Sequence, residues 1–427
     1  MRHRLTLFLV FGAVLTLLGE WNLKNGGEGF AAGLNRWWLE FCIANSRDKI
    51  ADPAVTLVTI DDEYKPAIGE SLSQADFAAV FGFVGKFSPK AVAFEPNPVF
   101  DESLAINQTT LELLKEATLP LPRVTLGAVA ENGQPPAGPT EEPKFPVLTK
   151  VEGDTANVTP LTRVVAAPNP QLLANGLPAF TGIELDGTTD RSLPLIARQG
   201  DKIVASFIVT AVASHAGVPL DQVTVKLPAV GSGVIEIGEK IRVPIDGRGR
   251  MKLYEQSGVG PGFYPVVSAF QLALTGDEDE AIRKLLADVE KDFETLRQNL
   301  VVIGRDRTED RRATLVGYDK PLSRAELLTR AIATIQSGRY VDWWPFWARL
   351  LSVAVIALLA AAAFRRSRGK AIAWSLLGAF LWFGIAMVAF KSTLAWAPPF
   401  APLALFALMF IIGAVLPGAK ADSPAKA

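Results

Sequence analysis

Acidic side chains directly follow two apolar segments that are typical of buried strands. Asp61 and Asp62 follow the Val/Thr/Leu/Ile segment 54–60, and Glu95 follows the short segment 91–94. In a parallel sheet the carboxyl ends of the strands lie at one edge, where the loops diverge and leave a crevice that can hold a ligand. We therefore expect these three carboxylates to converge at the carboxyl edge of a sheet.

A third apolar segment, 300–303, ends at Gly304 and adds both signs of charge to the same edge. Clustered carboxylates raise one another's pKa unless a cation, an arginine or a ligand amine compensates their charge, and their hard oxygen atoms suit Ca²⁺ or Mg²⁺. The sequence therefore predicts a ligand site here, with a divalent cation as one candidate occupant. In the alternative interpretation, Asp61 caps the turn that follows it, and the other carboxylates are solvated or paired with Arg305. The predicted site consists of Asp61, Asp62, Glu95, Arg305 and Asp306.

Other catalytic or metal-binding chemistry has little support in the sequence. The single cysteine, Cys42, excludes an intrachain disulfide and a multi-cysteine zinc site. Two histidines, His3 and His215, are too few for a histidine-rich metal site. The Gly-Ser-Gly segment 231–233 lacks the pattern of a nucleophile elbow, and the glycine-rich segment 258–262 contains a proline and is interpreted as a turn. We expect no catalytic residues, no enzymatic activity, and no cofactor apart from the candidate divalent cation.

A predicted helix joins the segments 54–60 and 91–94, and this order defines a βαβ unit. Ser73 is a candidate N-cap with Asp76 three positions later, and the helix extends to Lys86. Such a unit places its two strands in parallel, with a right-handed crossover.

The same alternation of strands and helices continues along the chain and defines the fold class. We predict an α/β outer domain around a mostly parallel mixed sheet, with an inserted antiparallel portion. The insertion includes a hairpin at 235–245, with Gly238-Glu239 as its turn, and two strands around a tight turn at Asp186-Gly187. Further predicted elements are helices at 104–117, 204–215, 277–298 and 324–336, strands at 124–129 and 300–303, and a Pro/Gly-rich surface loop at 130–147.

Four apolar segments predict four transmembrane α-helices, one N-terminal and three C-terminal. A helix needs about 20 residues, and at least ~17, to cross a hydrocarbon core of ~30 Å. The first segment is the shortest. It follows the basic flank 2–4 and lacks a small-residue cleavage pattern, which favours an uncleaved signal-anchor over a removed signal peptide. In the second segment, Arg349 is close enough to one end for its side chain to reach the interface. The four segments are 5–19, 346–364, 371–390 and 400–416.

The distribution of charge orients these segments. The formal net charge is −1, but residues 20–342 hold 33 Lys and Arg against 43 Asp and Glu, whereas basic residues cluster before the first segment and at 365–370. Basic flanks remain in the cytoplasm, so we expect residues 20–342 outside and both termini inside. An acidic outer region binds phosphate poorly, so we expect no nucleic-acid partner. The predicted parts are a signal-anchor helix at 1–19, an extracytoplasmic domain at 20–342, a three-helix membrane bundle at 343–416 and a short cytoplasmic tail at 417–427.

Motifs along the outer domain resemble those of one sensory family. The segments 55–62 and 89–95 are similar to its first two strand blocks, although Glu95 stands where the family usually has Asp. Together with the later blocks, over about 50–340, they resemble the type-two CHASE domain (cyclase/histidine-kinase-associated sensing extracellular). The other matching positions are Asp186-Gly187, Arg191, Pro194-Leu195, 267–269, 301–304, 321–322 and 326–339.

The resemblance implies that the outer domain senses an external signal and passes it across the membrane. The family's output is commonly a cyclase or kinase fused after the third span, and the segment 417–427 is too short to form one. We therefore expect a sensor subunit in the bacterial inner membrane that relays a ligand or envelope signal to a separate cytoplasmic or membrane output protein. Lipid is an expected partner, and assembly into a homo-oligomer stays open. The alternatives are a structural or assembly subunit of an envelope complex, and an extracytoplasmic enzyme that uses the strand-end carboxylates.

Overall fold

The computed structural model divides the chain into two compact units, which are described separately. We call residues 1–48, 230–232 and 342–427 the helical unit, and residues 49–229 and 233–341 the sheet unit. Predictions for the segments 132–144, 183–186, 258–262 and 417–427 lie outside the described residues. The structure describes residues 2–24, 30–46, 53–66, 72–96, 105–122, 124–131, 145–182, 187–189, 191–254, 264–275, 280–287, 289–315, 320–363 and 368–415.

The sheet unit is built around one large sheet with five parallel strands in the order β15-β1-β16-β2-β3. At its far side, β3 pairs in parallel with β6 and antiparallel with β5. This confirms the predicted α/β fold with a mostly parallel mixed sheet. The strands are β1 (Val55–Ile60), β2 (Ala91–Phe94), β3 (Val124–Glu131), β5 (Arg163–Ala166), β6 (Gly176–Phe180), β15 (Val266–Ser268) and β16 (Leu300–Arg305).

Helices cover both faces of this sheet, so its strands are apolar at nearly every position. The helices of the sheet unit are α3 (Gln74–Gly85), α4 (Ala105–Thr118), α5 (Phe207–Ala216), α6 (Ala269–Ala273), α7 (Glu280–Ala287), α8 (Glu290–Glu294) and α9 (Arg324–Gln336). Successive side chains of a strand point to opposite faces. Val55 and Leu57 of β1 pack in one core with α5 and α9, whereas Val58 and Ile60 pack in the other with α3, α4 and α6. All six residues of β1 are buried, as expected for a parallel strand covered on both faces.

A second sheet, of order β13-β12-β11-β4, is inserted between β3 and β15 in the sequence. Its β11–β12 and β12–β13 pairs are antiparallel, and its β11–β4 pair is parallel. The predicted hairpin at 235–245 is confirmed, with Ile237 opposite Ile241. Its turn therefore contains three residues, and Gly238 adopts a φ of 62°, which glycine tolerates without strain. The strands are β4 (Lys150–Gly153), β11 (Thr224–Leu227), β12 (Gly233–Ile237) and β13 (Ile241–Ile245).

The predicted pair of strands around Asp186-Gly187 stays a prediction, because its first strand falls on residues 183–186, outside the described ranges. The described strand β7 (Gly187–Thr189) pairs in parallel with β17 (Ala313–Leu315), which lies more than 120 residues later in the chain. The next strand, β8 (Ser192–Pro194), pairs with β14 (Arg250–Lys252). A short hairpin of β9 (Ile196–Gln199) and β10 (Lys202–Ala205) follows.

Three predicted helices, the one that ends at Lys86 and those at 104–117 and 324–336, agree closely with the structure over the described residues, and two do not. Ser73 caps α3 in a reciprocal capping box with Asp76, and α9 spans the predicted residues. The segment 204–215 begins as a strand, because Val204 and Ala205 end β10 and Ser206 caps α5. The segment 277–298 contains the two short helices α7 and α8 rather than one long helix.

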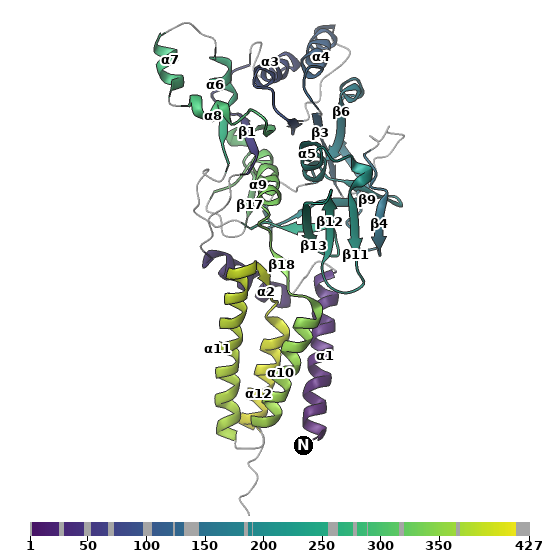
Figure 1. Ribbon diagram of the computed structural model, residues 1–427, viewed down its shortest axis with the longest axis vertical. Coiled ribbons are helices and arrows are strands. Elements are labelled where there is room, and N and C mark those ends of the chain that lie inside the picture. The colour runs from purple at the N-terminus through teal and green to yellow at the C-terminus, as the bar shows by residue number, and fades with distance from the viewer. Residues whose placement is uncertain are drawn as a thin grey trace, which may run out of the picture. The chain divides into compact units, whose positions relative to one another are not determined.

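The helical unit contains the apolar segments (Figure 1). Helix α10 and residues 372–393 of α11 are long and apolar enough to cross a membrane. The apolar parts of α1 (8–21) and α12 (400–414) are shorter. Strands β18 (Asp342–Trp343) and β19 (Ala395–Trp396) pair in parallel in the same unit. The helices are α1 (Arg2–Lys24), α2 (Phe30–Ala44), α10 (Phe346–Ala363), α11 (Arg368–Thr393) and α12 (Phe400–Val415).

Candidate functional site

The three strands that carry the predicted site residues are neighbours in the sheet, in the order β1-β16-β2. Hydrogen bonds extend their pairing past the strand ends. The Asp306 N–H donates to the Ile60 carbonyl at 3.1 Å, and the Glu95 N–H donates to the Ile303 carbonyl at 2.9 Å. The structure therefore brings all five predicted residues to one carboxyl edge, which we call the sheet edge.

Glu95 is the most deeply buried of the five, with 6% of its surface exposed. Its nearest cation is Arg324, whose Nη1 lies 3.4 Å from Glu95 Oε1. Burial raises the pKa of Glu95, while the guanidinium groups of Arg324 and Arg305 act in the opposite direction. Since a buried carboxylate is stable only with compensating charge, the ionised form of Glu95 depends on these two arginines.

Each of the two charged residues at the end of β16 pairs with a residue five positions later. Arg305 Nη2 lies 2.6 Å from Asp310 Oδ1. Asp306 accepts two hydrogen bonds from Arg311, at 3.1 Å from Nε and 2.7 Å from Nη2. The two pairs fold the segment 305–311 back on itself, and Arg305 compensates Asp310 as well as Glu95.

The aspartates after β1 have different environments. Asp61 Oδ1 accepts the backbone N–H groups of Glu63 and Tyr64 at 3.1 and 3.2 Å, so its side chain caps the turn after β1. Asp62 Oδ2 accepts the Thr308 hydroxyl at 2.7 Å and the Thr308 N–H at 3.2 Å, and these bonds hold the pKa of Asp62 below its usual range. Asp61 thus stabilises a turn, whereas Asp62 joins that turn to the segment after β16.

Helix α9 begins against this edge because Gly304 has no side chain. A Cβ at Gly304 would lie 2.1 Å from the Ala325 Cβ, far inside carbon–carbon contact. The first turn of α9 is capped by Ser323, whose Oγ accepts the Glu326 N–H at 3.2 Å. The close approach places Arg324, the first residue of α9, beside Glu95.

A second ion pair lies one turn further along α9. Arg330 Nη2 lies 2.6 Å from Glu326 Oε1, with only 6% and 16% of the two side chains exposed. Burial and the Asp306 carboxylate raise the pKa of Glu326 to about 7, against the effect of Arg311. Burial, assisted by the nearby Arg191, lowers the pKa of Arg330 to about 10. The charged network therefore extends from the sheet edge into the buried side of α9.

Arginine side chains compensate several of the carboxylates at the sheet edge. Of the described carboxylates, Glu95, Asp306 and Asp310 each lie within 3.4 Å of an arginine nitrogen. Within the described ranges, no three acidic, histidine or cysteine side chains are grouped so that they could hold a metal ion. Ligand binding at this edge stays a prediction, and any ionic ligand would exchange with one of these pairs.

Sequence reasoning missed the arginines and acids that complete the network, namely Asp310, Arg311, Arg324, Glu326 and Arg330. A signal for them exists, since four arginines occur between 305 and 312 and a capped helix starts at Ser323. The pairing of Arg324 with Glu95, however, depends on how close α9 comes to β16. That distance depends on Gly304, and spacing along the chain does not reveal it.

The helical unit contains a buried ion pair of its own. Arg349 Nη1 pairs with Glu20 Oε1, which joins α10 to α1, and the exposed fractions of the two residues are 9% and 7%. An acidic partner inside the unit therefore compensates the charge of Arg349, and the expectation that its side chain reaches a membrane interface stays a prediction. Glu20 Oε2 also accepts the Gly231 N–H at 3.2 Å.

Comparison with known families identifies the chain. Residues 6–362 match the family model of the CHASE2 domain. The chain belongs to the CHASE2 domain family. CHASE2 is a family of extracellular sensory domains, which agrees with a sensor role for this chain and with the resemblance noted in its sequence. No curated protein and no solved structure matches the chain.

Proposed function

We propose that this CHASE2 protein is a non-enzymatic sensor subunit that relays an external signal through its membrane helices to a separate output protein. In this proposal α1, α10, α11 and α12 all span a bacterial inner membrane. Residues 20–342 lie outside the cytoplasm, and both termini lie inside. The signal is a ligand or an envelope protein that acts on the sheet edge.

The observation that carries the proposal is the position of α9 in the chain. Its first residue, Arg324, contacts Glu95 at the sheet edge. The body of α9 is buried and packs in the core beside β1 and β16. The helix ends at Gln336, and the chain enters the helical unit at Asp342. A change at the sheet edge thus acts on a rigid helix that is joined by a short segment to α10.

A second covalent connection supports the same route. The segment 230–232, between β11 and β12, belongs to the helical unit. Within that unit Gly231 donates to Glu20 of α1, and the Ser232 hydroxyl donates to Asp342 Oδ1 at 3.3 Å. The inserted sheet is therefore tied to α1 and to the chain that leads into α10.

A signal can shift the equilibrium between two conformations of this protein only if it binds them with different affinity. To convert a 1:99 population into 99:1, the difference in affinity has to be about 10⁴-fold. Exchange of a buried ion pair such as Glu95–Arg324 would supply most of this difference, because removing one partner of a buried pair costs about 3–5 kcal/mol, against about 5.5 kcal/mol for the full conversion.

The test combines identification of the partner with a matched pair of variants. The full chain is cross-linked in its native membrane and purified, and the proteins that accompany it are identified. We expect an output protein, such as a cyclase or kinase, whose activity changes in Glu95→Gln but not in Glu63→Gln, because Glu63 is exposed and Glu95 is buried at the network.

Three results would contradict the proposal. If no output protein accompanies the chain and deletion alters no signalling activity, the relay is wrong. Recovery of a stoichiometric envelope complex without signalling activity would favour an assembly role. Turnover of a small molecule that disappears in Glu95→Gln would favour an extracytoplasmic enzyme.

A further inference from the structure

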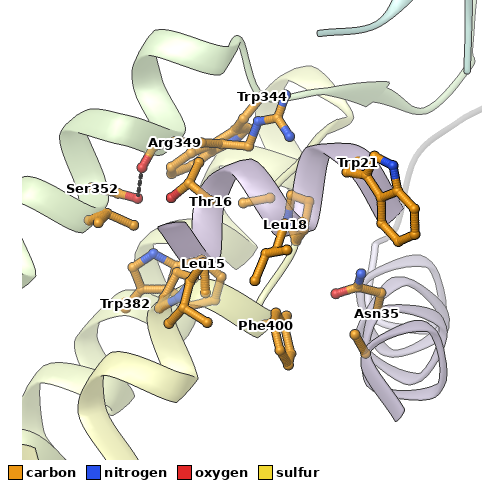
Figure 2. A pocket seen from close by; sticks show the side chains of 17 residues that line it. Leu15, Thr16, Leu18, Trp21, Asn35, Trp344, Arg349, Ser352, Trp382 and Phe400 are labelled. Carbon is orange, nitrogen blue, oxygen red and sulfur yellow. Dashed lines mark hydrogen bonds between the residues drawn. The ribbon is translucent and has the colours of Figure 1, made fainter. Parts of the chain in front are cut away.

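The helical unit encloses a cavity of about 240 Å³ between its helices (Figure 2). Side chains from α1, α2, α10, α11 and α12 contribute to its walls. Most of the lining is apolar, including Leu15, Leu18, Val353 and Phe400. An apolar wall of this kind favours an apolar occupant.

Among the described lining residues, three polar atoms are buried without a hydrogen bond: Asn35 Oδ1, Trp382 Nε1 and Arg349 Nε, the last on a guanidinium that is already paired with Glu20. The side chains of Asn35 and Trp382 line the cavity, and the residues are only 9% and 7% exposed. Within the described part of the chain, Asn35 Oδ1 and Trp382 Nε1 are buried without a hydrogen bond. Figure 2 shows the Asn35 amide extending from α2 toward the apolar side chains of α1 and α12. Buried polar groups in folded proteins are almost always paired, so these two atoms indicate a bound molecule that supplies their partners.

The chemistry of the lining defines that molecule. Trp382 Nε1 is only a donor, so it needs an acceptor oxygen, whereas Asn35 Oδ1 is an acceptor, so it needs a hydroxyl or N–H donor. The one cation of the lining, Arg349, is already paired with Glu20. An anionic ligand would have to separate this buried pair, which is costly. A neutral ligand leaves the pair intact.

We propose that this cavity binds the head of a neutral, membrane-dissolved amphiphile that carries both an acceptor oxygen and a hydroxyl donor. The volume is somewhat below the range of about 300–1,000 Å³ for small-molecule pockets. It therefore suits a head group, with the apolar tail in the surrounding lipid. Two sources share this chemistry, namely a reduced isoprenoid quinone and a neutral glycerolipid with a free hydroxyl. The site is separate from the sheet edge, and its existence does not depend on the relay.

Gly19 and Gly33 provide a matched pair of variants for the test. Gly19 of α1 lines the cavity, and a Cβ there meets no atom within 4 Å, so Gly19→Leu introduces a side chain at the cavity wall without a backbone clash. Gly33 of α2 has the same open surroundings but does not line the cavity, so Gly33→Leu is the control. In a third variant, Trp382→Phe, an aromatic ring remains but the Nε1 donor is lost.

Equilibrium binding of reduced, radiolabelled decylubiquinone and, in a separate series, of radiolabelled dioleoylglycerol to the full chain in nanodiscs measures the site, with unlabelled dioleoylglycerol and hexadecane as competitors. We expect saturable binding by the wild type and by Gly33→Leu. We expect at least tenfold weaker binding by Gly19→Leu, and about fivefold weaker binding by Trp382→Phe, because one neutral hydrogen bond contributes about 1 kcal/mol.

The competitors identify the source of the head group. If dioleoylglycerol displaces the quinone, the site accepts glycerolipid, and if it does not, the site is selective for quinone. Two results overturn the proposal. One is the absence of saturable binding of both probes. The other is binding that hexadecane displaces as well as dioleoylglycerol does, or binding that Gly19→Leu leaves unchanged. Either result would show that no head group is recognised in this cavity. Neither outcome bears on the output protein, which is tested separately.

Discussion

Replacing Gly304 by alanine tests whether close packing of α9 on β16 positions the charged network. The added Cβ would lie 2.1 Å from the Ala325 Cβ and 3.3 Å from the Ala325 Cα. Both atoms belong to the first turn of a capped, buried helix, so no flexible side chain can move aside. Ordinary carbon contacts are about 3.5–4.0 Å, so the helix start has to retreat from the strand by roughly 1.5 Å.

The expected cost has two parts. Overpacking a well-packed core typically costs about 1–3 kcal/mol, and a rigid neighbour favours the upper end of that range. Retreat of the helix also lengthens the contact between Arg324 and Glu95, which is 3.4 Å in the structure. We therefore expect Gly304→Ala to lower the free energy of unfolding of the sheet unit by about 3 kcal/mol.

Pulse proteolysis of the full chain in nanodiscs over a urea series measures this change. Gly82→Ala is the control, because Gly82 lies in α3, is exposed, and would place its Cβ more than 4 Å from other atoms. Alanine is a better helix former than glycine by about 1 kcal/mol, so this variant should be slightly stabilised. If Gly304→Ala unfolds within about 0.5 kcal/mol of the wild type while the control behaves as expected, α9 does not pack on β16 as described, and the argument about the sheet edge fails.

Four further predictions concern charge. Arg324→Leu should destabilise the sheet unit by about 2–3 kcal/mol near pH 7, where it leaves the buried Glu95 carboxylate without its nearest cation. The loss should be smaller near pH 4, because burial raises the pKa of Glu95 and the group is protonated there. Urea unfolding at the two pH values measures the difference. Burial raises the pKa of Glu326 from its model-peptide range to about 7, so the folded state binds the proton more tightly and stability falls as the pH rises from about 4.5 to 7. Unfolding of Glu326→Gln across that window should show a shallower pH slope, and an unchanged slope would contradict the assignment. Glu20→Gln and Arg349→Met should each lower the free energy of unfolding of the helical unit by about 3–5 kcal/mol, and the double variant should lower it by less than either. Unfolding in detergent followed by tryptophan fluorescence measures this change, because all nine tryptophans lie in that unit. Millimolar Ca²⁺ or Mg²⁺ should leave the unfolding midpoint of the sheet unit unchanged, because arginines already compensate the sheet-edge carboxylates.

Local signals predicted the parts of the sheet unit that depend on neighbouring residues. The Ser73–Asp76 capping box defines the start of α3, and the apolar segments of β1 and β2 define strands buried on both faces. The segment 204–215 was ambiguous, because a short apolar sequence suits a buried strand and a buried helix equally well. Ser206 divides it into β10 and α5 by capping the helix.

The order of the strands could not be derived from the sequence in the same way. A right-handed crossover makes β1 and β2 parallel, but it does not determine which strand lies between them. In the structure this strand is β16, which lies more than 200 residues after β2 in the chain. The convergence of charges at the sheet edge was predictable from strand ends alone, whereas the pairing partners required this order and the contact at Gly304.

The exposure of the paired groups indicates how a signal could enter the network. In the two pairs after β16, the side chains of Arg305 and Arg311 are 47% and 44% exposed, whereas those of Asp310 and Asp306 are 14% and 10% exposed. The guanidinium groups of these pairs are therefore accessible to solvent, whereas the carboxylates are largely buried. A cation could reach a carboxylate only after an arginine moved, but an anionic group could approach the arginines directly and compete for them. Because Arg305 also compensates the buried Glu95, any such competition changes the charge balance at the first turn of α9.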